Sequence, residues 1–302
     1  MKVALPELFR HELNSRLPDD VHFSWYRDVQ DVAGAAHDAD VLVIGFIDAR
    51  EIRAAIEAAP RATWVSTHAA GIDHYPLPTL QQRGVVLTKG AGVNAAPIAE
   101  FVVLCILSAA KGFPRLVEAS LRGEWPSERT PAMELDGSRA LILGFGNVGR
   151  EVAIRLEPLG VRVTGVHRHD DWRESLGEFE WIVVTAALTR ESRHLVGASE
   201  LEHMREDAWI FNVSRGGLID HAALAQAILA GRPLGAYLDV TEPEPLPREH
   251  PLWSTPNVVI TGHSAGRSKR SHERYATLFL DNLQRFRQGQ PLRNLVDLSA
   301  GY

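Results

Sequence analysis

Residues 140–149 of the 302-residue chain read ALILGFGNVG, and they are the most informative segment for predicting the fold. An apolar run typical of a buried strand, Ala140–Leu143, leads into a G-x-G-x-x-G sequence that opens a helical segment. In such a turn the first glycine permits the tight bend, the second lets a pyrophosphate approach the backbone, and the third allows close packing of helix on strand. The N–H groups that begin the helix then attract the phosphates. The stretch therefore predicts a dinucleotide site formed by Gly144, Gly146, Asn147, Val148 and Gly149.

Short apolar runs recur along the chain on both sides of this turn. Those before it lie at residues 3–5, 21–25, 41–44, 64–66 and 85–88, and those after it lie at residues 161–166, 181–185, 209–213, 236–240 and 258–261. Helical stretches separate them, which is the pattern of parallel strands covered by helices on both faces. The sequence therefore predicts an α/β protein with two doubly wound parallel-sheet domains that meet between residues 90 and 138.

The composition is that of an ordinary globular protein, with 45% hydrophobic and 23% charged residues. The 32 basic and 38 acidic residues give a formal net charge of −6, which argues against a dedicated nucleic-acid binder. The longest apolar run, residues 101–110, is too short to cross a membrane, and the first residues do not resemble a secretory signal. We therefore expect a soluble, cytoplasmic protein with one reduced cysteine, Cys105, and with neither nucleic-acid nor membrane partners.

Two other kinds of site can be weighed against the dinucleotide site. His167 and His169 could begin a metal site, but no Cys, His or carboxylate set completes it, so no metal is expected. Residues 262–266, GHSAG, match the G-x-S-x-G nucleophile elbow of serine hydrolases, with Ser264 as the nucleophile. That fold needs an acid and then a histidine later in the chain. Because the sole downstream histidine, His272, precedes the downstream aspartates, a hydrolase stays a remote alternative.

The residues after the second strand of the dinucleotide unit bear on the choice of cofactor. An acidic residue is expected there, because it would hydrogen-bond the ribose hydroxyls of NAD. The sequence has His167, Arg168 and His169 instead. They form either a solvated loop or a cationic pocket in which Arg168 pairs with a 2′-phosphate. Asp170 and Asp171 would oppose such a pocket if they turned inward. We expect NADP as the preferred cofactor and NAD as the alternative.

Several separated motifs, taken in order, resemble those of the D-2-hydroxyacid dehydrogenase family over most of the chain. They are Ala69-Ala70-Gly71-Ile72-Asp73, Ala99-Glu100, the glycine turn, residues 212–217 (NVSRGG), residues 238–240 (LDV) with Glu244-Pro245, and residues 257–266 (NVVITGHSAG). The resemblance implies a flavodoxin-like substrate domain at residues 1–94 and 272–302, interrupted by a Rossmann cofactor domain at residues 95–271. It also implies a homodimer, which the family forms through the apolar helix corresponding to residues 98–110.

The resemblance further implies hydride transfer between a nicotinamide cofactor and a small 2-keto acid or D-2-hydroxy acid, with glyoxylate and hydroxypyruvate among the expected substrates. Arg215 would hold the substrate carboxylate through its planar guanidinium, and His263 would donate a proton to the carbonyl oxygen. Glu244 would orient the His263 ring and favour its charged form. A dinucleotide-sensing binding protein on the same scaffold is the alternative, but the intact set of three residues favours an enzyme.

Other binding residues follow from the same resemblance. Backbone N–H groups near Ala70 and Gly71 would bind the substrate carboxylate, and Phe46 would form a wall of the substrate pocket. Asp239 would bind the nicotinamide carboxamide. Besides the glycine turn, the expected cofactor contacts are His167, Arg168, Ala186, Val213, Ser214, Asp239 and Gly266.

Three positions depart from the family pattern. Gly262 and Ala187 stand where the family has prolines, and His167 stands where it has an acidic residue. Because proline restricts the backbone, Gly262 is expected to loosen the turn that precedes His263.

Overall fold

The computed structural model describes residues 1–46, 48–125 and 132–301. They form two compact units: unit 1 comprises Met1–Asn94 and Ser268–Tyr302, and unit 2 comprises Ala95–Arg267. Each unit is built on one parallel sheet, so the predicted α/β fold with two doubly wound parallel sheets is confirmed. The sequence analysis places the return of the chain to unit 1 at residue 272, whereas in the structure the return falls at Ser268, in the loop before the last helix.

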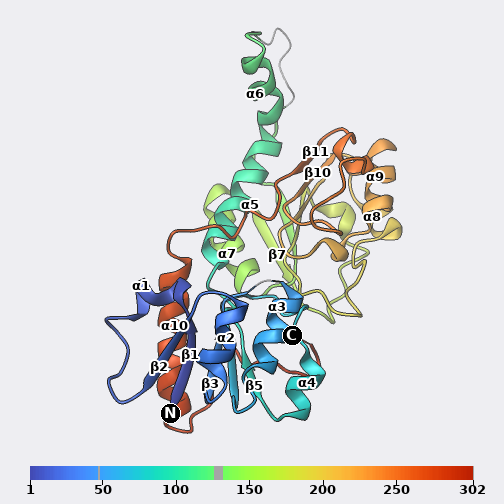
Figure 1. Cartoon of the computed structure of the whole chain (residues 1–302). Helices are drawn as coiled ribbons and strands as arrows, with labels where there is room; N and C mark the ends of the chain where they lie inside the picture. Colours follow the sequence, from blue (N-terminus) through green and yellow to red (C-terminus); the bar gives the residue numbers. More distant parts are fainter. Residues whose placement is uncertain (47, 126–131, 302) are drawn as a thin grey trace. The chain divides into compact units, whose positions relative to one another are not determined.

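Unit 1 contains a five-stranded parallel sheet with the order β2-β1-β3-β4-β5, which is the flavodoxin-like order. Helices cover both faces of this sheet (Figure 1). Ile52 and Ile56 of α3 pack on one face, and Tyr275 and Phe279 of α10 pack on the other. The strands are β1 (Lys2–Pro6), β2 (His22–Tyr26), β3 (Val41–Ile44), β4 (Trp64–Thr67) and β5 (Val86–Thr88). The helices are η1 (Glu7–Phe9), α1 (Arg10–Leu13), α2 (Val29–Ala36), α3 (Ala49–Glu57), α4 (Leu77–Gln82) and α10 (Ser271–Arg287).

Unit 2 contains a six-stranded parallel sheet with the order β11-β10-β9-β8-β6-β7. On one face α5 and α7 pack side by side (Figure 1), and on the other α8 and α9 contribute Leu201, Leu224 and Ile228 to the core. The strands are β6 (Arg139–Leu143), β7 (Arg162–Val166), β8 (Trp181–Val184), β9 (Trp209–Asn212), β10 (Gly235–Leu238) and β11 (Val258–Ile260). The helices are α5 (Ala95–Ala110), α6 (Phe113–Leu121), α7 (Asn147–Leu156), η2 (Glu157–Leu159), η3 (Leu176–Glu178), α8 (Ala198–His203), η4 (Gly216–Leu218), α9 (His221–Leu229) and η5 (Pro251–Trp253).

The strand order of unit 2 locates its ligand site. The chain reverses its direction of progress across the sheet between β6 and β8, and ligands of such sheets bind outside the carboxyl ends of the strands at that point. Because all the strands are parallel, the residues that follow them lie along one edge. Gly144 follows β6, Arg215 follows β9, Asp239 follows β10 and His263 follows β11.

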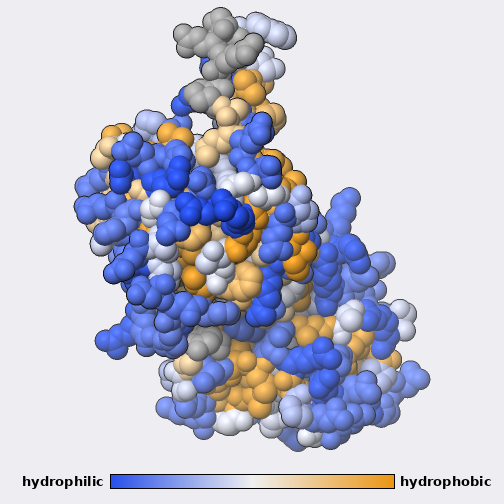
Figure 2. All heavy atoms as spheres, turned by 180° about the vertical axis from the view of Figure 1, so that it is seen from behind, coloured by the Kyte–Doolittle hydropathy of each residue, from blue (hydrophilic) through white to orange (hydrophobic). Residues whose placement is uncertain are grey.

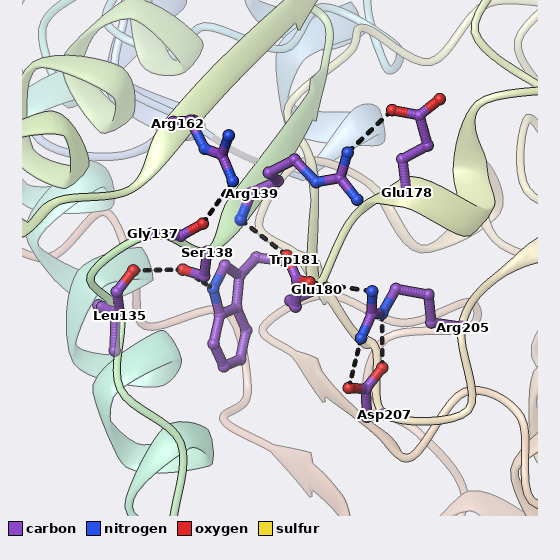
Figure 3. A network of polar contacts seen from close by, with 10 residues as sticks. All are labelled: Leu135, Gly137, Ser138, Arg139, Arg162, Glu178, Glu180, Trp181, Arg205 and Asp207. Carbon is purple, nitrogen blue, oxygen red and sulfur yellow. Dashed lines mark hydrogen bonds and ion pairs between the residues drawn. The ribbon is translucent and has the colours of Figure 1, made fainter.

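The opposite edge of this sheet carries a polar network with a structural role (Figure 3). The Trp181 indole N–H donates to Ser138 Oγ at 2.9 Å, and that hydroxyl donates in turn to a backbone carbonyl. The Glu180 carboxylate accepts the Arg139 backbone N–H at 2.7 Å and pairs with Arg205 at 3.1 Å. The network therefore fixes the first residues of β6 and β8. It lies at the amino ends of the strands, away from the carboxyl ends, where ligands of such sheets bind.

No single helix of the part of the chain that the structure describes is long and apolar enough to cross a membrane. Among the described helices, one pair, α5 and α6 taken together, meets the length and composition of a span, and the two helices are bent by 74° relative to each other.

Candidate active site

The glycine turn after β6 has the shape needed to hold a pyrophosphate. Gly144 has a φ of +100°, and a Cβ there would lie 2.5 Å from the Ala186 backbone, so only glycine fits. A Cβ at Gly149 would lie 2.8 Å from the Gly144 carbonyl oxygen. At Gly146, by contrast, a Cβ would meet nothing within 4 Å. The open space at Gly146, which offers no capping side chain to the first N–H groups of α7, fits the phosphates of a dinucleotide.

The loop after β7 holds the residues expected to bear on cofactor choice. Asp170 turns back on this loop, because its carboxylate accepts the His167 backbone N–H at 2.7 Å. The His167 ring packs edge-on against Phe145 of the glycine turn, with ring centroids 6.2 Å apart. Arg168 forms an ion pair with Glu191, which lies in the loop after β8. The cationic loop therefore lies beside the glycine turn, with the Arg168 side chain 44% exposed.

His263 and Glu244 form a pair of the kind used in proton transfer. The His263 Nδ1 atom lies 2.8 Å from Glu244 Oε2, and Glu244 Oε1 accepts the Thr241 backbone N–H at 3.1 Å. Both carboxylate oxygens of Glu244 are thus engaged, which fixes its orientation. Since Nδ1 of the imidazole faces Glu244, Nε2 is the ring nitrogen that can serve a ligand. The His263 side chain is 54% exposed and so accessible to one.

The turn that carries His263 has an unusual backbone. Gly262 and His263 both lie in the left-handed region, with φ values of +61° and +56°. Proline fixes φ near −65°, so it could not occupy position 262 in this conformation. The glycine expected to loosen the turn instead permits a specific left-handed one. A non-glycine residue in this region is strained, and such strain is common at functional sites.

Asp239 holds this turn in place. Its buried carboxylate accepts the Thr261 hydroxyl at 2.6 Å and the backbone N–H groups of Ser264 and Ala265 at 2.7 and 3.0 Å. Its backbone carbonyl accepts the His263 N–H at 2.5 Å. These four bonds offset the strain of the left-handed turn. No local sequence pattern indicates this supporting role, and the assignment of Asp239 to the nicotinamide carboxamide stays a prediction.

Arg215 follows β9 in a segment braced by a buried asparagine. The Asn212 side-chain amide donates to the Arg215 carbonyl at 2.8 Å, and its oxygen accepts the Ser214 N–H at 3.1 Å. The Ser214 hydroxyl donates to the Ala186 carbonyl at 2.5 Å, which ties the end of β9 to the end of β8. The Arg215 guanidinium donates to the Ser214 carbonyl at 2.8 Å. The expected contacts Ala186 and Ser214 therefore lie together, near Gly144.

The segments that carry Arg215 and Glu244 are in direct contact. A Cβ at Gly216 would lie 2.0 Å from the Thr241 carbonyl carbon, so the backbones touch there. Next to this contact, the two terminal nitrogens of the Arg193 guanidinium donate to the two carboxylate oxygens of Glu242, at 2.6 and 2.9 Å. The Arg193–Glu242 pair could not be predicted from the sequence, because no local pattern links charges 49 residues apart.

In unit 1, Ala70 and Gly71 lie in the loop after β4. The Gly90 N–H donates to the Ala69 carbonyl at 2.9 Å. A Cβ at Gly90 would lie 2.0 Å from the His68 carbonyl oxygen, so only glycine permits this approach. The segment after β5 therefore holds the loop by its backbone.

The remaining expected ligands lie at strand ends of their own units. Phe46 follows β3 and packs on Tyr26, with ring centroids 5.6 Å apart. Val213 follows β9 and is partly buried against the core of unit 2. Gly266 lies in the turn that the Arg267 N–H closes on the Ser264 carbonyl at 3.1 Å.

The described residues also bear on the two other kinds of site considered from the sequence, a metal site and a serine hydrolase site. Among residues 1–46, 48–125 and 132–301, no group of three or more His, Cys, Asp or Glu side chains could hold a metal ion. The Ser264 hydroxyl donates to the Gly262 carbonyl at 3.5 Å, while the neighbouring His263 is directed to Glu244. That arrangement is not the serine–histidine pair of a hydrolase.

A glycine turn after the first strand of a parallel sheet, with an arginine, a glutamate and a histidine at the same edge (here Arg215, Glu244 and His263), is an arrangement typical of nicotinamide-dependent oxidoreductases. Residues 103–265 match the family model described as D-isomer specific 2-hydroxyacid dehydrogenase, NAD binding domain. The chain belongs to the D-2-hydroxyacid dehydrogenase family.

Similar proteins are found among both characterised sequences and solved structures. The chain is 32% identical to the glyoxylate reductase of Korarchaeum cryptofilum over 86% of this chain and 83% of that protein. It is 28% identical to the D-3-phosphoglycerate dehydrogenase of Methanocaldococcus jannaschii over 86% of this chain, but it spans only about half (52%) of that protein's length. A D-isomer specific 2-hydroxyacid dehydrogenase from Xanthobacter autotrophicus Py2, solved in complex with NADPH and MES, superposes with a TM-score of 0.82 at 25% identity, covering 100% of this chain and 99% of that one.

Proposed function

We propose that the protein is a reductase of small 2-keto acids of the glyoxylate and hydroxypyruvate type, and that it prefers NADPH to NADH. The observation that carries this proposal is the 2.8 Å His263–Glu244 pair, held at the same sheet edge as Arg215 and the glycine turn. The printed name of the Korarchaeum cryptofilum relative supports the substrate class.

In the proposed mechanism His263 is the proton donor. Its Nδ1 atom faces the Glu244 carboxylate at 2.8 Å, and this contact holds the ring in one orientation. The Nε2–H is then the donor to the carbonyl oxygen of the keto acid, where negative charge develops. Bound nicotinamide would supply the hydride that is added to C2. The left-handed turn at residues 262–263, fixed by Asp239, keeps the ring in place while the proton moves.

Arg215 is the proposed carboxylate ligand. Its guanidinium can bind a carboxylate through two parallel hydrogen bonds and can polarise the neighbouring carbonyl. The contact of Gly216 with Thr241 fixes the Arg215 segment relative to the segment of Glu244. Ala70, Gly71 and Phe46 of unit 1 are proposed as further substrate contacts, by family resemblance.

The preference for NADPH rests on Arg168. A carboxylate at position 167 would bind the ribose 2′-hydroxyl and repel a 2′-phosphate, but His167 stands there. Arg168 follows His167, whose ring packs on Phe145 of the glycine turn, and an arginine there can pair with the phosphate. A charge-assisted hydrogen bond of this kind is worth about 1.5–3 kcal/mol.

A panel of 2-keto acids assayed with NADH and with NADPH tests the whole proposal. We expect steady turnover of glyoxylate or hydroxypyruvate, with a higher kcat/KM for NADPH. If no keto acid is turned over, the proposed reductase activity would be contradicted, and a dinucleotide-sensing protein would be favoured. Turnover with a higher kcat/KM for NADH would contradict only the proposed preference for NADPH.

We also propose that the protein is a homodimer formed through α5 and α6. Apolar residues gather over these helices in Figure 2, and large apolar side chains on them are exposed: Leu104, Leu107, Phe113, Leu116, Val117 and Leu121. An exposed apolar surface of this kind marks a protein interface. A cytoplasmic location stays a prediction, which microscopy of a tagged protein would test.

A further inference from the structure

The loop after β8 contains a braced turn that presents Glu191 to the cationic loop. The Ser192 hydroxyl donates to the Ala187 carbonyl at 2.7 Å and accepts the Thr189 backbone N–H at 2.8 Å. The Thr189 hydroxyl in turn accepts the Ser192 N–H at 3.2 Å. The backbone on both sides of Glu191 is therefore held by hydrogen bonds, and its exposed side chain pairs with Arg168.

Glu191 neutralises the cation expected to select the cofactor. Its carboxylate pairs with the Arg168 guanidinium, and both side chains are largely exposed, at 70% and 44%. Arg168 lowers the pKa of the Glu191 carboxyl, with a smaller contribution from His169, so the carboxylate is charged at neutral pH. The carboxylate thus takes the position beside the guanidinium that a 2′-phosphate would require.

A 2′-phosphate and Glu191 must therefore compete for one guanidinium. The phosphate carries between one and two negative charges at neutral pH and more acceptor oxygens than a carboxylate, so it can displace Glu191. NADH has an uncharged hydroxyl in place of the 2′-phosphate, and with NADH bound Arg168 keeps Glu191 as its partner. Glu191 therefore weakens binding of NADPH and leaves binding of NADH nearly unchanged.

We infer that Glu191 is a specificity-determining residue, which limits the preference for NADPH by competing with the 2′-phosphate for Arg168. This inference rests on the proposed function, since it uses the same guanidinium. It assigns to the loop after β8 a part in cofactor choice that the sequence of the β7 loop does not reveal.

Binding measurements with two cofactor fragments test the inference without turnover. Calorimetry would give the Kd of adenosine 2′,5′-bisphosphate, which has the 2′-phosphate, and of AMP, which lacks it. Removing an exposed ion-pair partner changes affinity by a small factor, so Glu191→Gln should bind the bisphosphate about 2–5-fold more tightly and AMP equally well. Glu191→Lys, which adds a cation, should bind it more tightly still. Glu202→Gln, which removes a surface charge of α8 in the same unit, is the matched control and should bind both fragments as the parent does.

The same measurements in an Arg168→Ala background complete the test. There Glu191→Gln should change neither affinity, because the shared cation is gone. An equal effect of Glu191→Gln with and without Arg168, or no effect in either, would overturn the inference. The proposed NADPH preference is judged separately: it fails if the parent binds the bisphosphate no better than AMP, whatever Glu191→Gln does.

Discussion

His263 has a left-handed backbone conformation and is also the proposed proton donor. A substitution at this position should therefore remove the proton donor without disturbing the backbone. His263→Asn removes the proton donor and keeps a residue that tolerates the left-handed region. We expect kcat to fall by about 10²–10⁴, with the Kd for the cofactor unchanged. Stopped-flow and calorimetric measurements on His263→Asn and His263→Ala would check this. Near-normal turnover in the asparagine variant would show that another group donates the proton.

Arg215 is open to a test that keeps its charge. Arg215→Lys retains one positive charge but loses the planar pair of donors that fits a carboxylate. The KM for the keto acid should rise and kcat should fall, each by about tenfold or more, since a lost charge-assisted hydrogen bond costs about 1.5–3 kcal/mol. Steady-state kinetics at saturating cofactor would measure both. A KM that stays at the parent value would show that a residue other than Arg215 binds the substrate carboxylate.

At the scale of single elements, the glycines of the β6–α7 turn have different roles. Gly146 is expected to be needed for cofactor binding, whereas Gly144 and Gly149 are needed for folding. Gly146 has a φ of −86°, and a Cβ there would stand in open space, so Gly146→Ala should leave the free energy of unfolding nearly unchanged. The added methyl would occupy the space of the pyrophosphate, so cofactor affinity should fall by about tenfold or more. Gly144→Ala is the matched variant and should unfold the unit, since its Cβ would lie 2.5 Å from Ala186. Denaturant unfolding and cofactor titration would distinguish them, and normal cofactor binding by Gly146→Ala would contradict the site.

The same elements show what a sequence can and cannot predict. The parallel strands and the β6–α7 turn follow from local patterns, namely apolar runs and glycine spacing, and the structure contains them. The positions of Arg215, Glu244 and His263 along one edge follow once the strands are known to be parallel. The Arg168–Glu191 and Arg193–Glu242 pairs join different loops, and no periodicity connects their partners. The left-handed turn at Gly262 was also beyond prediction, because it depends on the bonds that Asp239 supplies.

On the scale of the whole molecule, a partly buried histidine in unit 1 and a buried histidine in unit 2 make the free energy of unfolding depend on pH. Burial lowers the pKa of His68 in unit 1, opposed in part by a hydrogen bond to the Ile44 carbonyl. Burial also lowers the pKa of His221 in unit 2, where His250 acts in the same direction. Below pH about 6.5 the unfolded chain binds protons that the folded chain excludes, so stability is complete above this pH and falls below it.

The expected loss is at most about 1.4 kcal/mol per pH unit for each histidine. Thermal unfolding at pH 7.5 and pH 5.5 would measure it, with His221→Asn and His68→Asn as variants that cannot titrate. Each variant should show a weaker dependence of Tm on pH than the parent. Identical slopes in parent and variants would rule out these two histidines as the cause.

The assembly of two chains is also testable at this scale. Leu116→Asp with Leu121→Asp places two charges on the exposed apolar side of α6, and sedimentation should then show a monomer where the parent sediments as a dimer. Leu8→Asp, at an exposed leucine of unit 1, is the matched control and should leave the dimer intact. A parent that sediments as a monomer would contradict the proposed interface.

The packing of α10 on the sheet of unit 1 has a consequence for how the chain is made. Val3 and Leu5 of β1 share one apolar cluster with Tyr275 and Phe279 of α10. Trp64 of β4 stacks on Phe279, at a ring-centroid distance of 5.6 Å. During synthesis on the ribosome, β1 emerges before unit 2, and α10 emerges only after it, so this face stays uncovered while all of unit 2 is made. Unit 2 is continuous in sequence and can fold in the meantime, so the nascent chain exposes an apolar sheet face that a chaperone can recognise until α10 has been synthesised.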